Sequence, residues 1–233
     1  MLASVRIHSA HGAALGSALL TSSLLLSLPV HAEAEAPRRT QAEVGPDVGV
    51  IGRVNAGDVS YTPGFAYGGH VRVWVLPWLG VRALVRHVAH DIELGSLAAS
   101  MGNPTLPLSV RSNELLGAIE PTLPLSPRLS LYGGPSVSWQ YLSTEPPAGG
   151  TLKLIERRGS FIAFGVNLGV SLEAIPHWLR FEANFNPSLP VGQRGDFFHA
   201  TQAFDPNGGR QLAAGFPKFQ ASYSLALSAT LLL

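Results

Sequence analysis

The segment from Ile162 to Glu173 reads Ile-Ala-Phe-Gly-Val-Asn-Leu-Gly-Val-Ser-Leu-Glu. Large apolar residues occupy every second position, and Ala, Gly, Asn, Ser or Glu occupies each position between them. Because successive side chains of a β-strand point to opposite faces, this period of two predicts a strand with one apolar and one polar face. Weaker copies of the alternation recur along the chain, and together they predict an all-β protein.

Three proline turns separate pairs of these alternating segments. They read Leu76-Pro77-Trp78-Leu79-Gly80-Val81-Arg82, Ser126-Pro127-Arg128-Leu129-Ser130-Leu131-Tyr132 and Ile175-Pro176-His177-Trp178-Leu179-Arg180-Phe181-Glu182. Proline fixes φ and has no N–H to donate to a sheet, so it marks the ends of strands. With these turns, the alternation predicts eight strands, at approximately residues 44–54, 65–76, 79–93, 109–121, 129–141, 157–174, 179–185 and 216–233. In the last strand, Phe219 is in phase with the apolar residues that follow it.

The first 32 residues have the features of a secretory signal peptide. Arg6 supplies a positive charge, residues 13–28 an apolar region, and Val30-His31-Ala32 a cleavage site. A retained membrane anchor is the alternative, but no stop-transfer charges follow. We therefore predict a signal peptide at 1–32, a flexible lead-in at 33–42 and one domain at 43–233. Cleavage removes Arg6, one of 16 basic residues, and none of the 15 acidic ones, so the mature chain is neutral.

Composition excludes several classes of protein. A neutral chain with scattered charges has no basic surface for nucleic acid. The chain has no cysteine, so it has no disulfide, thiolate metal site or cysteine nucleophile. No apolar run of 18 residues follows residue 32, so no helical membrane span is expected. Yet 46% of the residues are hydrophobic and only 13% are charged, about half the usual charged share of a soluble domain.

Alternation alone does not decide which face points inward. A soluble lipocalin-like or avidin-like barrel has its apolar face inside, and a membrane barrel has it outside. Three features favour the membrane barrel. The polar faces carry charges of balanced sign that can pair in a lumen, and the chain has only two Lys. The three proline turns are short, whereas the connections at 55–64, 94–108, 143–156 and 187–215 are long, as in outer-membrane barrels. Aromatic residues occur at both ends of the strands, and they predict two interfacial girdles that include Tyr67, Trp78, Trp139, Tyr141 and Trp178.

With a signal peptide, eight strands, loops of unequal length and the Pro-Trp-Leu-Gly-Val-Arg turn, the chain resembles the small eight-stranded outer-membrane barrels of Gram-negative bacteria, the OmpA-like and OmpX-like kind. The resemblance covers nearly all of the mature chain and implies an up-and-down antiparallel transmembrane β-barrel. It also implies lipopolysaccharide and outer-membrane lipid as surroundings, the barrel-assembly machinery as a partner, and a monomer. Barrels of this family commonly end in an aromatic residue, and this chain departs from that pattern with Leu231-Leu232-Leu233.

The polar faces predict a network of side chains inside the lumen. Its members are His70, Arg72, Arg82, Arg86, Glu114, Glu120, Tyr132, Glu173, Arg180, Glu182 and Asn184. Charges inside a membrane are tolerated when they are paired, and an eight-stranded lumen is just wide enough to be filled by side chains. We therefore interpret the network as a structural plug, with a gated ion pathway as the alternative.

His87, His90 and Asp91 are candidates for a metal or hydrolase site. Positions three apart on a strand face opposite sides, so the two His do not chelate one ion. His87 is predicted on the outward face, where lipid-A deacylases of this size keep a His-Ser site, but no Ser spacing identifies a nucleophile. We expect no catalytic residue, no metal and no cofactor.

The sequence thus predicts a non-enzymatic, porin-like outer-membrane protein with a filled lumen, which has a structural or surface-contact role through its outer loops. The alternatives are a narrow ion or small-solute pore, an outer-membrane lipid hydrolase, and a soluble ligand-binding barrel.

Overall fold

The computed structural model describes residues 42–55, 60–93, 107–145, 156–199, 201–204, 210–213 and 216–233. The predicted signal peptide, and the lead-in up to residue 41, lie outside these residues. Of the predicted long connections, 94–106 and 146–155 lie outside them too. No helix in the described part of the chain is long and apolar enough to cross a membrane.

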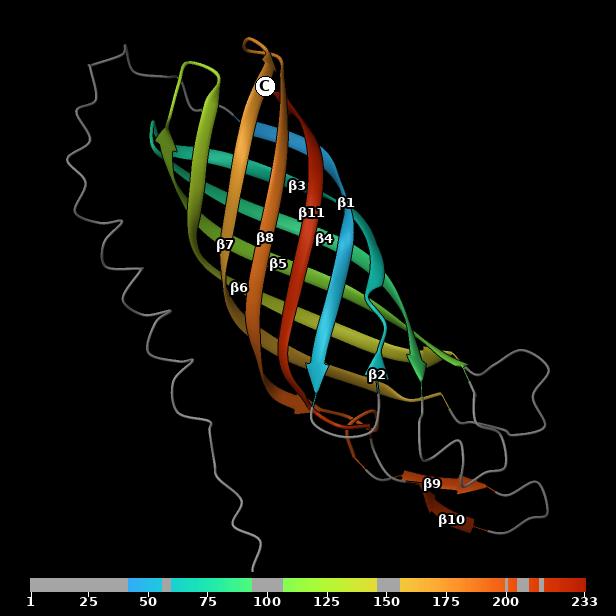
Figure 1. Ribbon diagram of the computed structural model, residues 1–233. Coiled ribbons are helices and arrows are strands. Elements are labelled where there is room, and N and C mark those ends of the chain that lie inside the picture. The colour runs from blue at the N-terminus through green and yellow to red at the C-terminus, as the bar shows by residue number, and fades with distance from the viewer. Residues whose placement is uncertain are drawn as a thin grey trace, which may run out of the picture. The chain divides into compact units, whose positions relative to one another are not determined.

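Eight long strands form a closed antiparallel barrel (Figure 1). Each strand pairs with the next, and the last closes the barrel by pairing with the first. The strands are β1 (Ala42–Asn55), β3 (Gly64–Leu76), β4 (Leu79–Glu93), β5 (Pro107–Pro124), β6 (Leu129–Glu145), β7 (Arg158–Ile175), β8 (Leu179–Arg194) and β11 (Phe219–Leu232). The predicted fold, an eight-stranded up-and-down β-barrel, is confirmed.

Three short strands accompany the barrel. β2 (Ser60–Tyr61) pairs with the last two residues of β4 and lengthens the barrel wall there. β9 (Thr201–Phe204) and β10 (Arg210–Ala213) pair with each other in a separate two-stranded sheet. Both additions fall in stretches that were predicted as loops.

The apolar face of the strands is the outside of the barrel. Val85 and Leu227 are each 60% exposed, whereas Arg72 is 1% and Glu120 0% exposed. This is the reverse of a soluble barrel, and it satisfies the physical requirement of a membrane, because lipid favours apolar side chains and a closed sheet leaves no backbone group unpaired.

The two ends of the barrel differ in their connections. We call one the short-turn end, since it holds the turns at 77–78, 125–128 and 176–178, and the other the long-loop end. Backbone hydrogen bonds fasten the chain at the short-turn end, from Leu232 N to Trp178 O (3.1 Å) and from Leu233 N to Ala42 O (2.9 Å). Trp78 and Trp178 lie there and are 52% and 68% exposed.

Strand β8 is longer than the sequence predicts. The prolines Pro187 and Pro190 indicate a loop from residue 187, but the strand continues to Arg194. The β7–β8 ladder is interrupted opposite Pro187, and beyond Ser188 the strand pairs with β7 alone. One side of β8 is therefore an edge there, which is where a sheet tolerates proline.

The start of β11 also corrects the sequence prediction. Phe219 is predicted on the apolar outward face, but it is 3% exposed and lies inside the barrel. The β1–β11 register shifts between Val54 and Asn55, so that Val54 pairs with Ala221 and Asn55 with Phe219. An extra residue in a ladder moves the side chains beyond it to the other face.

Candidate functional site

A cluster of charges fills the lumen near the short-turn end, with Arg72 at its centre. The guanidinium of Arg72 donates from Nε to Glu120 Oε2 (2.6 Å) and from Nη1 to Glu43 Oε2 (2.9 Å). It also donates from both terminal nitrogens to the carboxylate of Glu182. Its carbon Cζ lies 4.6 Å from the ring centroid of Tyr132. Three carboxylates on three different strands are thus joined through one arginine.

Two further arginines balance the charge of this cluster. Arg82 pairs with Glu182 and with Glu120, whose Oε1 lies 3.2 Å from Arg82 Nε. Arg180 Nη1 donates to Glu43 Oε1 at 2.6 Å. Three carboxylates and three guanidiniums therefore lie together, which meets the condition under which buried charge is tolerated.

Tyr132 completes the cluster, and Gly169 makes room for it. The hydroxyl of Tyr132 hydrogen-bonds to Glu182 and Asn184, and its ring lies against Gly169, its partner across the β6–β7 ladder. A Cβ atom at position 169 would overlap this ring. The β6–β7 register therefore makes Gly169 the residue that leaves room for this ring.

Gly169→Ala is therefore expected to lower the free energy of unfolding by about 1–3 kcal/mol, because the added methyl group forces Tyr132 out of its position. The matched control is Gly117→Ala, where a Cβ would meet nothing within 4 Å. Urea unfolding of both variants in the same lipid measures the difference. Equal unfolding midpoints would contradict the assigned contact.

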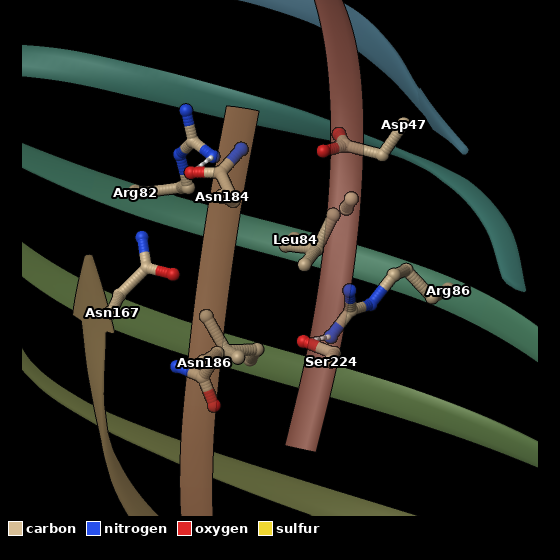
Figure 2. A pocket seen from close by; sticks show the side chains of 10 residues that line it. Asp47, Arg82, Leu84, Arg86, Asn167, Asn184, Asn186 and Ser224 are labelled. Carbon is tan, nitrogen blue, oxygen red and sulfur yellow. Dashed lines mark hydrogen bonds between the residues drawn. The ribbon is translucent and has the colours of Figure 1, made fainter. Parts of the chain in front are cut away.

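The middle of the lumen holds smaller polar groups and a small cavity. His70 Nδ1 lies 2.5 Å from Asp47 Oδ2, and Arg86 Nη2 donates to Glu114 Oε2 at 2.6 Å. The side chains that line the cavity, shown in Figure 2, are those of Asp47, Arg82, Leu84, Arg86, Leu116, Asn167, Asn184, Asn186, Ser224 and Ala226. The cavity has room for about one water molecule.

An aromatic cluster fills the lumen at the long-loop end. It consists of Tyr61, Val110, Leu142, Phe161, Ala163, Phe197, Phe198 and Phe219, with Phe216 packed against it. Phe197 and Phe198 come from the segment that follows β8, and both are almost fully buried. The sequence analysis did not predict this cluster, because its members come from several separate segments whose meeting depends on the register of the barrel.

The structure brings ten of the eleven predicted lumen residues into the barrel interior: His70, Arg72, Arg82, Arg86, Glu114, Glu120, Tyr132, Arg180, Glu182 and Asn184. Glu173 does not join them. It lies two residues before the end of β7, and its Oε1 accepts a hydrogen bond from the backbone N of His177 in the turn (2.5 Å). Its strand position has the inward phase, but the strand ends too soon to bring it to the network.

Glu43, Asp47 and Asn167 also belong to the network, although they were not among the predicted site residues. Glu43 and Asp47 lie in the inward phase of β1, and Asn167 lies in that of β7, where its Nδ2 donates to Glu120 Oε1 at 2.5 Å. The alternation of apolar and polar residues indicates that these positions face inward, provided that it is extended to the first residues of β1. The predicted interfacial residues Tyr67, Trp139 and Tyr141 lie toward the long-loop end, with Tyr67 and Trp139 about half exposed.

The residues proposed for a metal or hydrolase site point to different partners. His87 faces outward, where Nδ1 lies 3.0 Å from Asn113 Oδ1. His90 faces inward and accepts from Arg53 Nε at Nε2 (3.1 Å). Asp91 accepts from Ser109 Oγ (2.9 Å). Within the described residues, no group of three metal-ligating side chains comes together.

The closed wall, the apolar outside and the filled polar lumen define the chain as an eight-stranded β-barrel with the fold of the small outer-membrane barrels. Its fold is similar to that of a major outer membrane protein from Thermus thermophilus, with a TM-score of 0.58 and 12% identity over 84% of this chain and 100% of that one. It is also similar to the outer membrane protein OprG from Pseudomonas aeruginosa, with a TM-score of 0.50 and 11% identity over 83% of this chain and 93% of that one. No protein-family model and no curated protein sequence matches the chain.

Proposed function

We propose that the protein is a non-enzymatic outer-membrane barrel that conducts no ions and acts at the cell surface through its long-loop end. The filling of the lumen carries this proposal. Paired charges occupy the short-turn end and aromatic rings occupy the long-loop end. Between them lies a cavity with room for about one water molecule. An ion that crosses a pore needs a continuous hydrated path or substitute ligands along its length.

The proposal places the short-turn end in the periplasm and the long-loop end outside the cell, since outer-membrane barrels have short periplasmic turns. The predicted signal peptide provides export. We further propose that the barrel is a monomer, that the barrel-assembly machinery inserts it, and that lipopolysaccharide surrounds its outer rim. Exposed arginines near the long-loop end, Arg111, Arg158 and Arg194, support the last point, because guanidinium groups bind phosphates well.

The surroundings of His87 and His90, the two histidines considered for a hydrolase site, support the absence of catalysis in this proposal. A hydrolase needs a nucleophile within hydrogen-bond distance of its base. His87 contacts the amide of Asn113 and the ring of Tyr67, whose centroid is 5.4 Å from its own. His90 is held between Arg53 and the carbonyl of Thr62. Neither is hydrogen-bonded to a serine in the described part of the chain.

Recordings in planar lipid bilayers test the proposal. The refolded full-length mature chain, whose insertion is verified by heat-modifiable migration on a gel, is expected to produce no stepwise currents. An open porin added to the same bilayer shows that the recording detects single channels. Reproducible current steps from the refolded chain would overturn the closed lumen and favour the narrow pore. A chain that stays soluble without detergent would instead overturn the membrane assignment.

A further inference from the structure

Arg53 is a buried cation that has no anionic partner among the residues that the structure describes. Its side chain enters the lumen at the long-loop end, and the residue is 6% exposed. Nε donates to His90 Nε2 (3.1 Å) and Nη2 donates to Ser112 Oγ (3.0 Å), both neutral acceptors, while Nη1 has no partner. Among the described residues no carboxylate forms an ion pair with Arg53. By contrast, each of the three arginines of the charge cluster at the short-turn end has such a partner.

The buried carboxylate of Glu114 is engaged by other residues. Its oxygens accept hydrogen bonds from Arg86 Nη2 (2.6 Å) and Gln140 Nε2 (3.0 Å). The surroundings of Arg53 are otherwise apolar, since its Cζ lies 4.7 Å from the ring centroid of Phe219 and 5.5 Å from that of Phe161. A guanidinium in such a place is expensive unless its charge is compensated.

Two buried hydroxyls near Arg53 also lack partners. Tyr61 is 8% exposed and its ring packs edge-on against Phe219, the ring that Arg53 covers, with centroids 4.9 Å apart. Its Oη makes no hydrogen bond within the described part of the chain. Ser222, which is directly opposite Arg53 in the β1–β11 ladder, has an unpartnered Oγ as well. Three donors are thus left without acceptors at one end of the lumen.

We propose that Arg53, Tyr61 and Ser222 bind a small monovalent anion, of the class of chloride or a short carboxylate. One negative charge neutralises the guanidinium, and one small acceptor can take hydrogen bonds from Nη1 and the two hydroxyls. The surrounding aromatic rings exclude water and favour an ion that is easily dehydrated over a multivalent one. This inference does not depend on whether the lumen conducts.

The test measures unfolding of the refolded full-length mature chain in detergent micelles as chloride replaces gluconate at constant ionic strength. An anion that binds only the folded barrel raises the unfolding midpoint with the logarithm of its concentration. A second series with formate distinguishes a carboxylate from an inorganic halide, and either response supports the site. Gluconate is too large for an enclosed site, so it serves as the inert reference.

Arg53→Gln is expected to abolish the chloride dependence, and Tyr61→Phe and Ser222→Ala are expected each to weaken the apparent affinity by about tenfold. The last two remove one hydroxyl each and keep the fold, so they decide the question if Arg53→Gln does not refold. The matched control is Ser228→Ala, which removes another buried hydroxyl without a partner in the described part of the chain. Residue Ser228 is opposite Asp47 in the β1–β11 ladder, away from Arg53. Equal anion dependence in all variants, or none in the parent chain with either anion, would overturn the proposal.

Discussion

Replacement of Arg72 by Met is expected to lower the free energy of unfolding of the barrel by about 3–5 kcal/mol. Methionine keeps much of the volume of the side chain but removes the charge that joins Glu43, Glu120 and Glu182. These three carboxylates are nearly inaccessible to water, and after the replacement Arg82 and Arg180 alone must neutralise them. Equilibrium urea unfolding in lipid vesicles measures the loss.

The matched control for this variant is Arg158→Met. Arg158 also forms an ion pair, with Glu156, but its side chain is 64% exposed. An exposed pair contributes little to stability, because water screens the attraction between its charges. Adding Glu182→Gln to Arg72→Met should restore part of the lost stability, because one of the unpaired charges disappears. If both single variants lost the same small amount, the cluster would contribute nothing as a structural plug.

Truncation of Phe219 to Ala is expected to lower the free energy of unfolding by about 3–5 kcal/mol. Its ring contacts those of Tyr61, Phe161, Phe197 and Phe198, and its removal leaves a cavity that the rigid barrel wall does not close. This result separates the observed inward position from the outward position that the alternation predicts.

Phe164→Ala is the control for this second variant. Phe164 is 57% exposed on the outward face of β7. Its truncation should lower stability only by about 1.5–3 kcal/mol, the transfer term for a ring, because fluid lipid fills the space that the ring leaves. The same vesicles and urea series compare the two. A smaller loss for Phe219 than for Phe164 would place Phe219 outside the barrel.

The charge cluster and the aromatic cluster close the lumen by different chemistry, so different substitutions destabilise them. The charge cluster at the short-turn end depends on every partner being present, whereas the aromatic cluster at the long-loop end depends on shape. The side chains of the charge cluster come from the barrel wall. Those of the aromatic cluster do too, except for Phe197 and Phe198, which belong to the segment directly after β8.

The sequence by itself determined the strands, the number of them in the barrel and the face that most side chains take. These properties are local, since a period of two along Ile162 to Glu173 or Leu79 to Glu93 needs no knowledge of the rest of the chain. The polar side chains that line the lumen could be predicted from the same alternation. Asp47 lies within the predicted first strand, and Glu43 follows when that strand is extended by one residue. The bounds of β8 could not be predicted from the sequence, because proline indicates a loop unless one edge of the strand is unpaired.

The tertiary structure alone decided which of these side chains meet. Arg72 and Glu182 are 110 residues apart, and only the closure and register of the barrel bring them together. The register shift near Val54 turns Phe219 inward, and the barrel wall then gathers it with Phe161, Phe197 and the unpaired Arg53. Alternation indicates to which face of the sheet a side chain points. Contact between side chains across the lumen depends on the stagger of all eight strands, which no single segment encodes.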